Sequence, residues 1–147
     1  MGVRDNKARF IIGIDPDLHK SGFAVYDRKD KKLTECTSLY MWQVFECLQD
    51  CCQELPKEQF FVRLEYPKNT NNYHGGGRGS SVNLGKNQAV AIILKEFLIA
   101  KGIRHELIFP AGYSNTFKDE KFFKKTTGYD ERTNCDARAA AAMCFKY

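Results

Sequence analysis

The order of predicted secondary-structure elements indicates an α/β fold with a mixed five-stranded sheet flanked by helices. Three segments of strand-forming residues come first, and helical segments then alternate with two further strands. Turns containing Asp and Gly join the first three strands, which predicts an antiparallel meander. A length of 147 residues suits one core, so we expect residues 1–147 to form a single domain.

The first half of the chain contains four of these strands and one helix. The strands are expected at Arg9 to Ile14, Gly22 to Tyr26, Lys32 to Ser38 and Gln59 to Glu65. Between the third and fourth strands, apolar residues recur at helical spacing from Met41 to Leu55 and stop before Pro56. This spacing predicts an amphipathic helix.

The second half is expected to begin with a long loop and to be mainly helical. Tyr66 to Gly85 is rich in Asn, Gly and Ser, and its position next to Glu65 favours a functional loop over a plain mobile one. The later elements are expected at about Lys86 to Lys101 (helix, ending at Gly102), His105 to Phe109 (strand), Phe117 to Thr127 (basic helix, ending at Gly128) and from Thr133 or Asn134 onward (helix).

The helix expected at 86–101 is apolar on more than one face. Its main stripe is predicted to consist of Val90, Ile93, Leu94, Phe97 and Leu98, with Ile92 and Ile99 outside the stripe. A helix of this kind is usually deeply buried or shared with a partner. We therefore expect a homodimer formed through this helix.

Composition favours a folded protein that binds a polyanion. Apolar residues make up 43% and charged residues 28%, which is ordinary for globular proteins. The net charge of +5 leans towards nucleic acid, although solubility alone would explain so modest an excess. No signal peptide or membrane-spanning run is recognised, so the six cysteines are expected to be reduced thiols in a cytoplasmic, non-secreted protein. Their spacing does not suit zinc.

Two acidic residues are expected at strand ends. Asp15 follows Ile14 and precedes Pro16, and Glu65 closes the strand that ends before Pro67. Burying a charged carboxylate is costly unless a cation or hydrogen bonds compensate. Either acid alone is best explained as an exposed strand end, but the two together favour metal ligands.

Four segments resemble the motifs of RuvC-type Holliday-junction resolvases, whose fold is ribonuclease H-like. Gly13 to Gly22 resembles the first motif, Leu64 to Pro67 the second, Gly85 to Ala89 the start of the central helix, and Asn134 to Arg138 the final acidic motif. The similarity covers nearly the whole chain, and small phage or bacterial members look nearest. It implies a metal-dependent endonuclease that resolves four-way DNA junctions by paired hydrolysis, inside a bacterial cell or phage-infected host.

The resemblance implies a two-metal site for Mg²⁺ or Mn²⁺ held by Asp15, Glu65 and Asp136, with Asp15 bridging the ions. The family carries two acids spaced three apart on the last helix, whereas Ala139 follows Asp136 at that spacing. If Asp136 is the second acid, Thr133 takes the first position and one acid is still missing. We hypothesise that Ala139 replaces an acid in order to trap a bound state. We then expect weak binding of one ion, strongly reduced cleavage and retained junction binding.

The first motif contains a further departure from the family. Asp17 stands where glycine usually follows the proline. Asp tolerates left-handed backbone better than most residues, so we expect the turn to be kept.

DNA binding is expected from basic side chains and from stacking aromatics. The expected phosphate contacts are Lys68, Arg78, Lys118, Lys121, Lys124 and Lys125, and the expected stacking residue is Tyr66 or Tyr73. A solvated surface is the alternative for the lysines, and ordinary packing is an equal alternative for the tyrosines. A twofold dimer would place two active sites on opposite strands of a junction.

Two other function classes stay open. The first is a different ribonuclease H-like nuclease that acts on hybrids, flaps or single strands. The second is a non-catalytic nucleic-acid-binding module, which only Ala139 supports.

Overall fold

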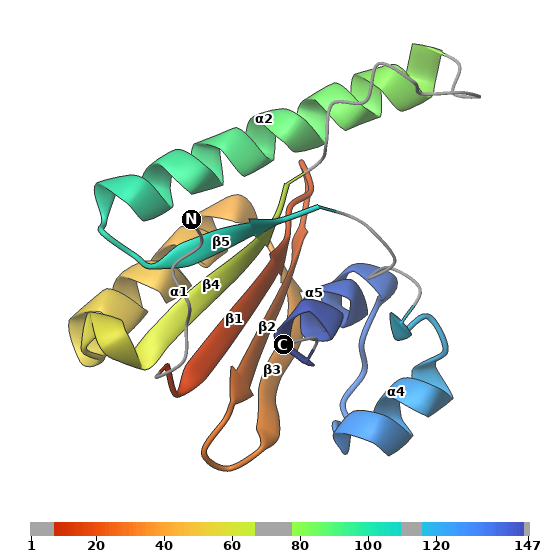
Figure 1. Cartoon of the computed structure of the whole chain (residues 1–147). Coiled ribbons are helices and arrows are strands. Elements are labelled where there is room, and N and C mark those ends of the chain that lie inside the picture. The colour runs from red at the N-terminus through yellow and green to blue at the C-terminus, as the bar shows by residue number, and fades with distance from the viewer. Residues whose placement is uncertain (1–7, 67–77, 110–115, 146–147) are drawn as a thin grey trace.

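The computed structural model describes residues 8–66, 78–109 and 116–145 (Figure 1). Its elements, in chain order, are β1 (Phe10–Asp15), β2 (Ser21–Asp27), β3 (Lys32–Leu39), α1 (Met41–Glu54), the short 3-10 helix η1 (Lys57–Gln59), β4 (Phe60–Glu65), α2 (Arg78–Ala100), β5 (His105–Ile108), α4 (Glu120–Thr127) and α5 (Cys135–Phe145). No helix in this part of the chain is both long and apolar enough to cross a bilayer.

The five strands form one mixed sheet in the order β3-β2-β1-β4-β5. β1, β2 and β3 are antiparallel neighbours, whereas β1 pairs with β4, and β4 with β5, in parallel. The predicted meander and the predicted mixed sheet are both confirmed. Because β1 and β4 are parallel, their carboxyl ends lie at the same edge of the sheet.

Helices cover both faces of the sheet. α1 and α2 lie on one face and α5 on the other, with α4 beside α5 (Figure 1). Side chains alternate along β1, so Ile12 and Ile14 belong to the core under α1 and α2, and Ile11 belongs to the core under α5. Each face of the sheet therefore has its own buried apolar layer.

α5 approaches the sheet so closely that no side chain separates their backbones at two points. A Cβ atom added to Gly13 would meet the carbonyl oxygen of Ala140, and one added to Gly22 would meet the carbonyl oxygen of Asp136. Weak thiol contacts also join helix and sheet, since Cys36 Sγ lies 3.2 Å from the Ala137 carbonyl oxygen. The small residues of β1, β2 and α5 thus fix the height of the helix above the strands.

The structure corrects the predicted start of α2. The helix begins at Arg78, so residues 78–85 are helical and not part of a flexible loop; residues 67–77 lie outside the described part. Ile93, predicted in the buried stripe, is 46% exposed, and Ala91 is buried instead. The start of α2 was predicted too late because its first turns contain glycine and serine residues, which are poor helix formers.

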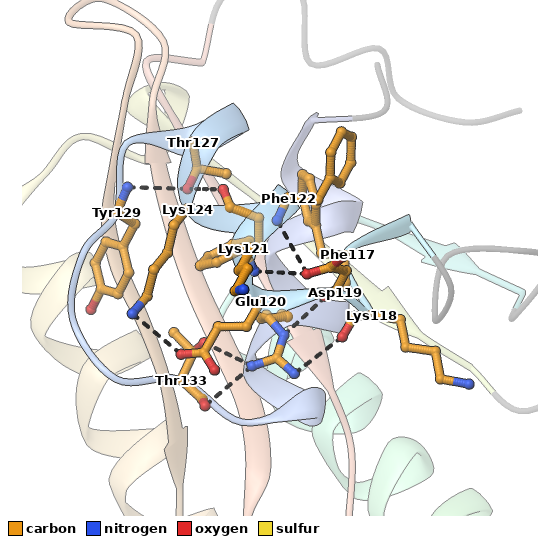
Figure 2. Close-up of polar contacts among 12 residues, drawn as sticks. Phe117, Lys118, Asp119, Glu120, Lys121, Phe122, Lys124, Thr127, Tyr129 and Thr133 are labelled. Atoms are coloured by element: carbon orange, nitrogen blue, oxygen red, sulfur yellow. Dashed lines mark hydrogen bonds and ion pairs between the residues drawn. The ribbon is translucent and has the colours of Figure 1, made fainter.

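The basic helix also begins later than predicted. α4 starts at Glu120, since the Asp119 carboxylate accepts hydrogen bonds from the backbone N–H groups of Lys121 and Phe122 and caps the helix (Figure 2). Phe117, predicted as its first residue, is buried before the helix. The remaining predicted elements agree with the structure to within one residue, and Asn134 is the residue before α5, as expected.

Substitution of Gly13 or Gly22 by alanine should destabilise the protein by about 1–3 kcal/mol, because the new methyl group overlaps the α5 backbone. Urea unfolding followed by circular dichroism measures this loss. Gly85→Ala is the matched control: a Cβ there meets no atom of the described residues within 4 Å, so the helix should gain up to about 1 kcal/mol. Equal stabilities for Gly13→Ala, Gly22→Ala and the unmodified protein would contradict the packing.

Candidate active site

Asp15 and Glu65 lie side by side at the carboxyl ends of β1 and β4. The strand pairing reaches Ile14 opposite Leu64, so the next residue on each strand is an acid. Both side chains lie on the face that α5 covers, because Asp15 pairs with Gly22, whose added Cβ would touch α5. A side-chain hydrogen bond joins the two carboxyl groups. Neighbouring strands have therefore brought together the two acids that the sequence singled out.

Burial of Asp15 raises its pKa well above the usual value for an aspartic acid. The hydrogen bond that the protonated Asp15 carboxyl donates to Glu65 raises the pKa further, as do the negative charges of Glu65, Asp136 and Asp17. The charged form of Asp15 is thus disfavoured without a compensating positive charge. A cation bound beside the two carboxyl groups would stabilise the charged form of Asp15.

Asp136 approaches this pair from above, in the first turn of α5. Its backbone carbonyl lies directly over Gly22, the residue that pairs with Asp15. Partial burial raises the pKa of Asp136, and the charge of Asp17 adds to this effect. The close packing of α5 on the sheet therefore places a third acid within electrostatic reach of Asp15.

The donor set fits a divalent cation at the Asp15–Glu65 pair and is incomplete beyond it. Carboxylate oxygens are the ligands that Mg²⁺ and Mn²⁺ prefer. No group of three or more His, Cys, Asp or Glu side chains among the described residues is arranged to hold a metal ion. Among the described residues, the charge of Asp136 acts on Asp15.

Neither position considered for the missing acid supplies one. Ala139 lies one turn after Asp136 in α5 and is 8% exposed. Thr133 precedes the helix, and its hydroxyl and carbonyl oxygens accept hydrogen bonds from the guanidinium group of Arg138.

Comparison with known proteins identifies the fold. No family model and no curated protein sequence matches the chain. Among solved structures, Thermus thermophilus RuvC in complex with a Holliday junction substrate aligns with a TM-score of 0.59 and 13% identity, over 92% of this chain and 89% of that one. A second structure of T. thermophilus RuvC aligns with a TM-score of 0.53 and 14% identity, over 90% and 91% of the two chains. The chain has the RuvC fold. The predicted ribonuclease H-like architecture is thereby confirmed.

The turn after Asp15 is kept for a different reason from the predicted one. Within the described part of this RuvC-like fold, Lys31 alone among non-glycine residues has a positive φ, so Asp17 does not adopt left-handed backbone. Its carboxylate instead accepts the His19 backbone N–H at 3.0 Å, and its own N–H donates to Ser21 Oγ at 3.1 Å. These two bonds hold the turn.

A cavity of about 300 Å³ lies beside this turn and is lined by Asp17, Leu18, His19, Lys86 and Asn87. The first motif and the start of the central-helix motif, far apart in sequence, are thus neighbours in the structure.

The basic residues predicted to bind DNA have different surroundings. Lys118, Lys121 and Lys125 are exposed, whereas Lys124 forms an ion pair with Glu120 at 3.4 Å (Figure 2). Tyr66 is half-buried, with Lys95 Nζ 5.9 Å from its ring centre, which supports packing at least as well as base stacking. Lys68, Tyr73 and the side chain of Arg78 lie outside the described residues.

Sequence reasoning missed two residues of this region. Phe122 is 50% exposed between the lysines of α4, and an aromatic residue inside a basic segment was the available signal. Arg138 is 6% exposed and donates to the carbonyl oxygens of Phe117 and Lys118, so it fastens the start of the α4 segment to α5. A single arginine within a run of alanines was the signal for Arg138.

Asp15→Asn should stabilise the metal-free protein at pH 8 by about 1 kcal/mol or more, because it removes a carboxyl whose charged form is disfavoured. For an acid with a raised folded-state pKa, the stabilising contribution is complete below the unfolded pKa and is lost as pH rises through the folded pKa. The advantage of the variant should therefore grow between pH 5 and pH 8. Thermal unfolding in EDTA measures it.

The exposed Asp50→Asn substitution on α1 is the control, and it should leave the pH dependence unchanged. Parallel pH profiles for Asp15→Asn and the unmodified protein would show that Asp15 is not held in an unfavourable electrostatic environment.

Proposed function

We propose that this chain is a metal-dependent, structure-selective endonuclease that resolves four-way DNA junctions. The observation that carries the proposal is the Asp15–Glu65 carboxyl pair at the ends of β1 and β4, with Asp136 above it, in a chain that has the RuvC fold. The solved RuvC structure with the higher TM-score here holds a Holliday junction substrate, which supports a branched DNA as the substrate class.

The proposed chemistry is hydrolysis of a phosphodiester bond. A divalent cation bound here would activate water and stabilise the charge on the leaving oxygen. Asp15 and Glu65 would hold it, and the proton that the raised pKa keeps on Asp15 would be released on binding. Asp136 adds negative charge beside the pair, and the buried layer under α5 limits access of water to one side of the site.

Lys118, Lys121 and Lys125 supply exposed positive charge for phosphate contacts. Each phosphate that such a side chain neutralises adds to the salt dependence of binding. We therefore expect junction affinity to fall steeply as salt concentration rises.

Restoring an acid in α5 tests the catalytic part of the proposal. Ala139→Asp should raise Mg²⁺-dependent cutting of a labelled four-way junction by at least about tenfold, since a carboxylate one turn after Asp136 would add a metal ligand on that flank of the helix. Cleavage is measured on denaturing gels with the junction, a matched linear duplex and an RNA–DNA hybrid.

Ala139→Asn is the matched control, because it has the size of Asp without the charge and should not gain activity. Asp15→Asn should abolish cutting in either background. Preferred cutting of the hybrid would indicate a different ribonuclease H-like nuclease. Junction binding without cutting by any variant would favour a binding module.

We also infer a homodimer formed through α2. Ile92, Ile93 and Ile99 are 42%, 46% and 60% exposed, although Leu94 and Leu98 of the same helix are fully buried against the sheet. Gly85 and Ala89 are exposed too, and residues this small permit a second helix to approach closely. A second copy packed through this face would cover the isoleucines and supply the second active site needed for paired cuts.

Ile92→Glu combined with Ile99→Glu should shift the protein from dimer to monomer, because each introduced charge would be buried in the interface. Sedimentation equilibrium measures the mass. Trp42→Glu on α1 is the control, since Trp42 is 59% exposed on a different helix and its replacement should leave the mass unchanged. A monomeric unmodified protein at micromolar concentration would contradict the inference.

A further inference from the structure

A second polar cavity lies between the end of β3 and the segment before α5. It has a volume of about 350 Å³ and is lined by Thr37, Ser38, Arg132, Thr133 and Asn134. Two of these residues come from the end of β3, and the other three form the segment that leads into α5. None of the five is acidic.

The sheet register places this cavity close to the candidate active site. Asp15 pairs with Gly22, and Gly22 pairs in turn with Ser38. Paired residues point to the same face, so Ser38 lies on the α5 face as Asp15 does. With neighbouring strands spaced about 4.8 Å apart, Ser38 lies about 10 Å from Asp15. A DNA strand rises about 3.4 Å per nucleotide along the helix axis, and its backbone path is longer, so this separation corresponds to at most about three nucleotides.

Two hydroxyl groups that line the cavity, those of Ser38 and Thr133, can still donate hydrogen bonds to a ligand. Ser38 Oγ accepts a bond from the Asn134 side-chain amide, and Thr133 Oγ1 accepts one from Arg138 Nη1 at 3.0 Å. A hydroxyl that accepts in this way still has its own O–H proton to donate. Neither hydroxyl donates to another group within the described residues, so both protons are available to a ligand.

Arg132 adds a positive charge to these donors. Its side chain is exposed and makes no ion pair with the described residues. Two hydroxyl donors and one guanidinium without an opposing carboxylate match a phosphate group, whose oxygens only accept hydrogen bonds. The first cavity, beside Asp17, offers no such match because it contains an acid.

We propose that the cavity formed by Ser38, Arg132 and Thr133 binds a backbone phosphate of the DNA strand that reaches the Asp15–Glu65 pair. The proposal rests on the proposed function, because it assigns the path of the same strand. Arg138 is a positioning residue here: it holds Thr133 from the buried side and also fastens the segment before α4. The strand would thus pass from the carboxyl pair across the end of β3 towards the exposed lysines near α4.

Salt-dependent binding tests the subsite. Fluorescence anisotropy with a labelled four-way junction in EDTA measures affinity between 50 and 200 mM NaCl, about the range over which phosphate contacts change affinity steeply. Arg132→Gln should weaken binding about threefold to tenfold and lower the slope of log affinity against log salt by about 0.9. Lys29→Gln is the matched control, since Lys29 is exposed in the β2–β3 hairpin at the opposite end of the sheet, and should change neither quantity.

A neutral methylphosphonate placed at each phosphate near the cut site then locates the contact. One position within about three nucleotides of the scissile phosphate should weaken binding by the unmodified protein, and the same substitution should have no further effect on Arg132→Gln. Ser38→Ala should show part of the same loss at that position. Circular dichroism and thermal unfolding confirm that each variant is folded.

The outcomes separate the subsite from the proposed function. If Arg132→Gln binds like the unmodified protein with the same salt slope, the subsite is wrong even though the unmodified protein binds and cuts the junction. If the unmodified protein does not prefer the junction to a linear duplex, the proposed function fails. A selective loss for Arg132→Gln at one phosphate of the linear duplex would still support the subsite.

Discussion

The direct contact between the backbone of α5 and strands β1 and β2 is the constraint on which the candidate site depends. At Gly13 and Gly22 the helix carbonyl groups occupy the space that side chains would fill. Asp136 is consequently held above the residue that pairs with Asp15. A larger residue at either glycine would lift the helix and separate the third acid from the other two. The buried alanines of α5 also allow the helix to pack close to the sheet.

Both ends of α5 are also anchored by polar contacts. At its start, the Asn134 side chain accepts the backbone N–H of Ala137 at 2.8 Å. At its end, the buried Arg63 of β4 donates to the Met143 carbonyl at 3.0 Å and also pairs with Glu106. Arg63 lies two residues before Glu65 on the same face of the strand. Strand β4 therefore supplies both Glu65 of the candidate site and Arg63, which anchors the end of α5.

Sequence patterns predicted what depends on local chemistry. Alternating apolar residues and proline breakers located the strands, and strand ends located Asp15 and Glu65. A single arginine among alanines was a signal for Arg138, but the pattern could not predict its acceptors, which are carbonyl groups about 20 residues away along the chain. It also placed the start of α2 too late, since helical structure at a Gly- and Ser-rich segment depends on the context of the fold. The cap at Asp119 depends on local chemistry, but the sequence-based prediction did not use it and placed the start of this helix at Phe117.

The absence of an acid at Ala139 changes the electrostatic balance of the site. Asp15 already carries a raised pKa because it is buried beside Glu65. A further carboxylate on this flank of α5 would add repulsion in the metal-free protein, and the cost would be recovered only when cations bind. With alanine there, the metal-free fold avoids that repulsion. The surfaces that we assign to DNA lie on β3, α4 and the segment before α5, so they do not depend on that acid. Under the proposed function, binding and cutting of DNA are therefore expected to be separable in this chain, with the residue at 139 affecting cutting alone.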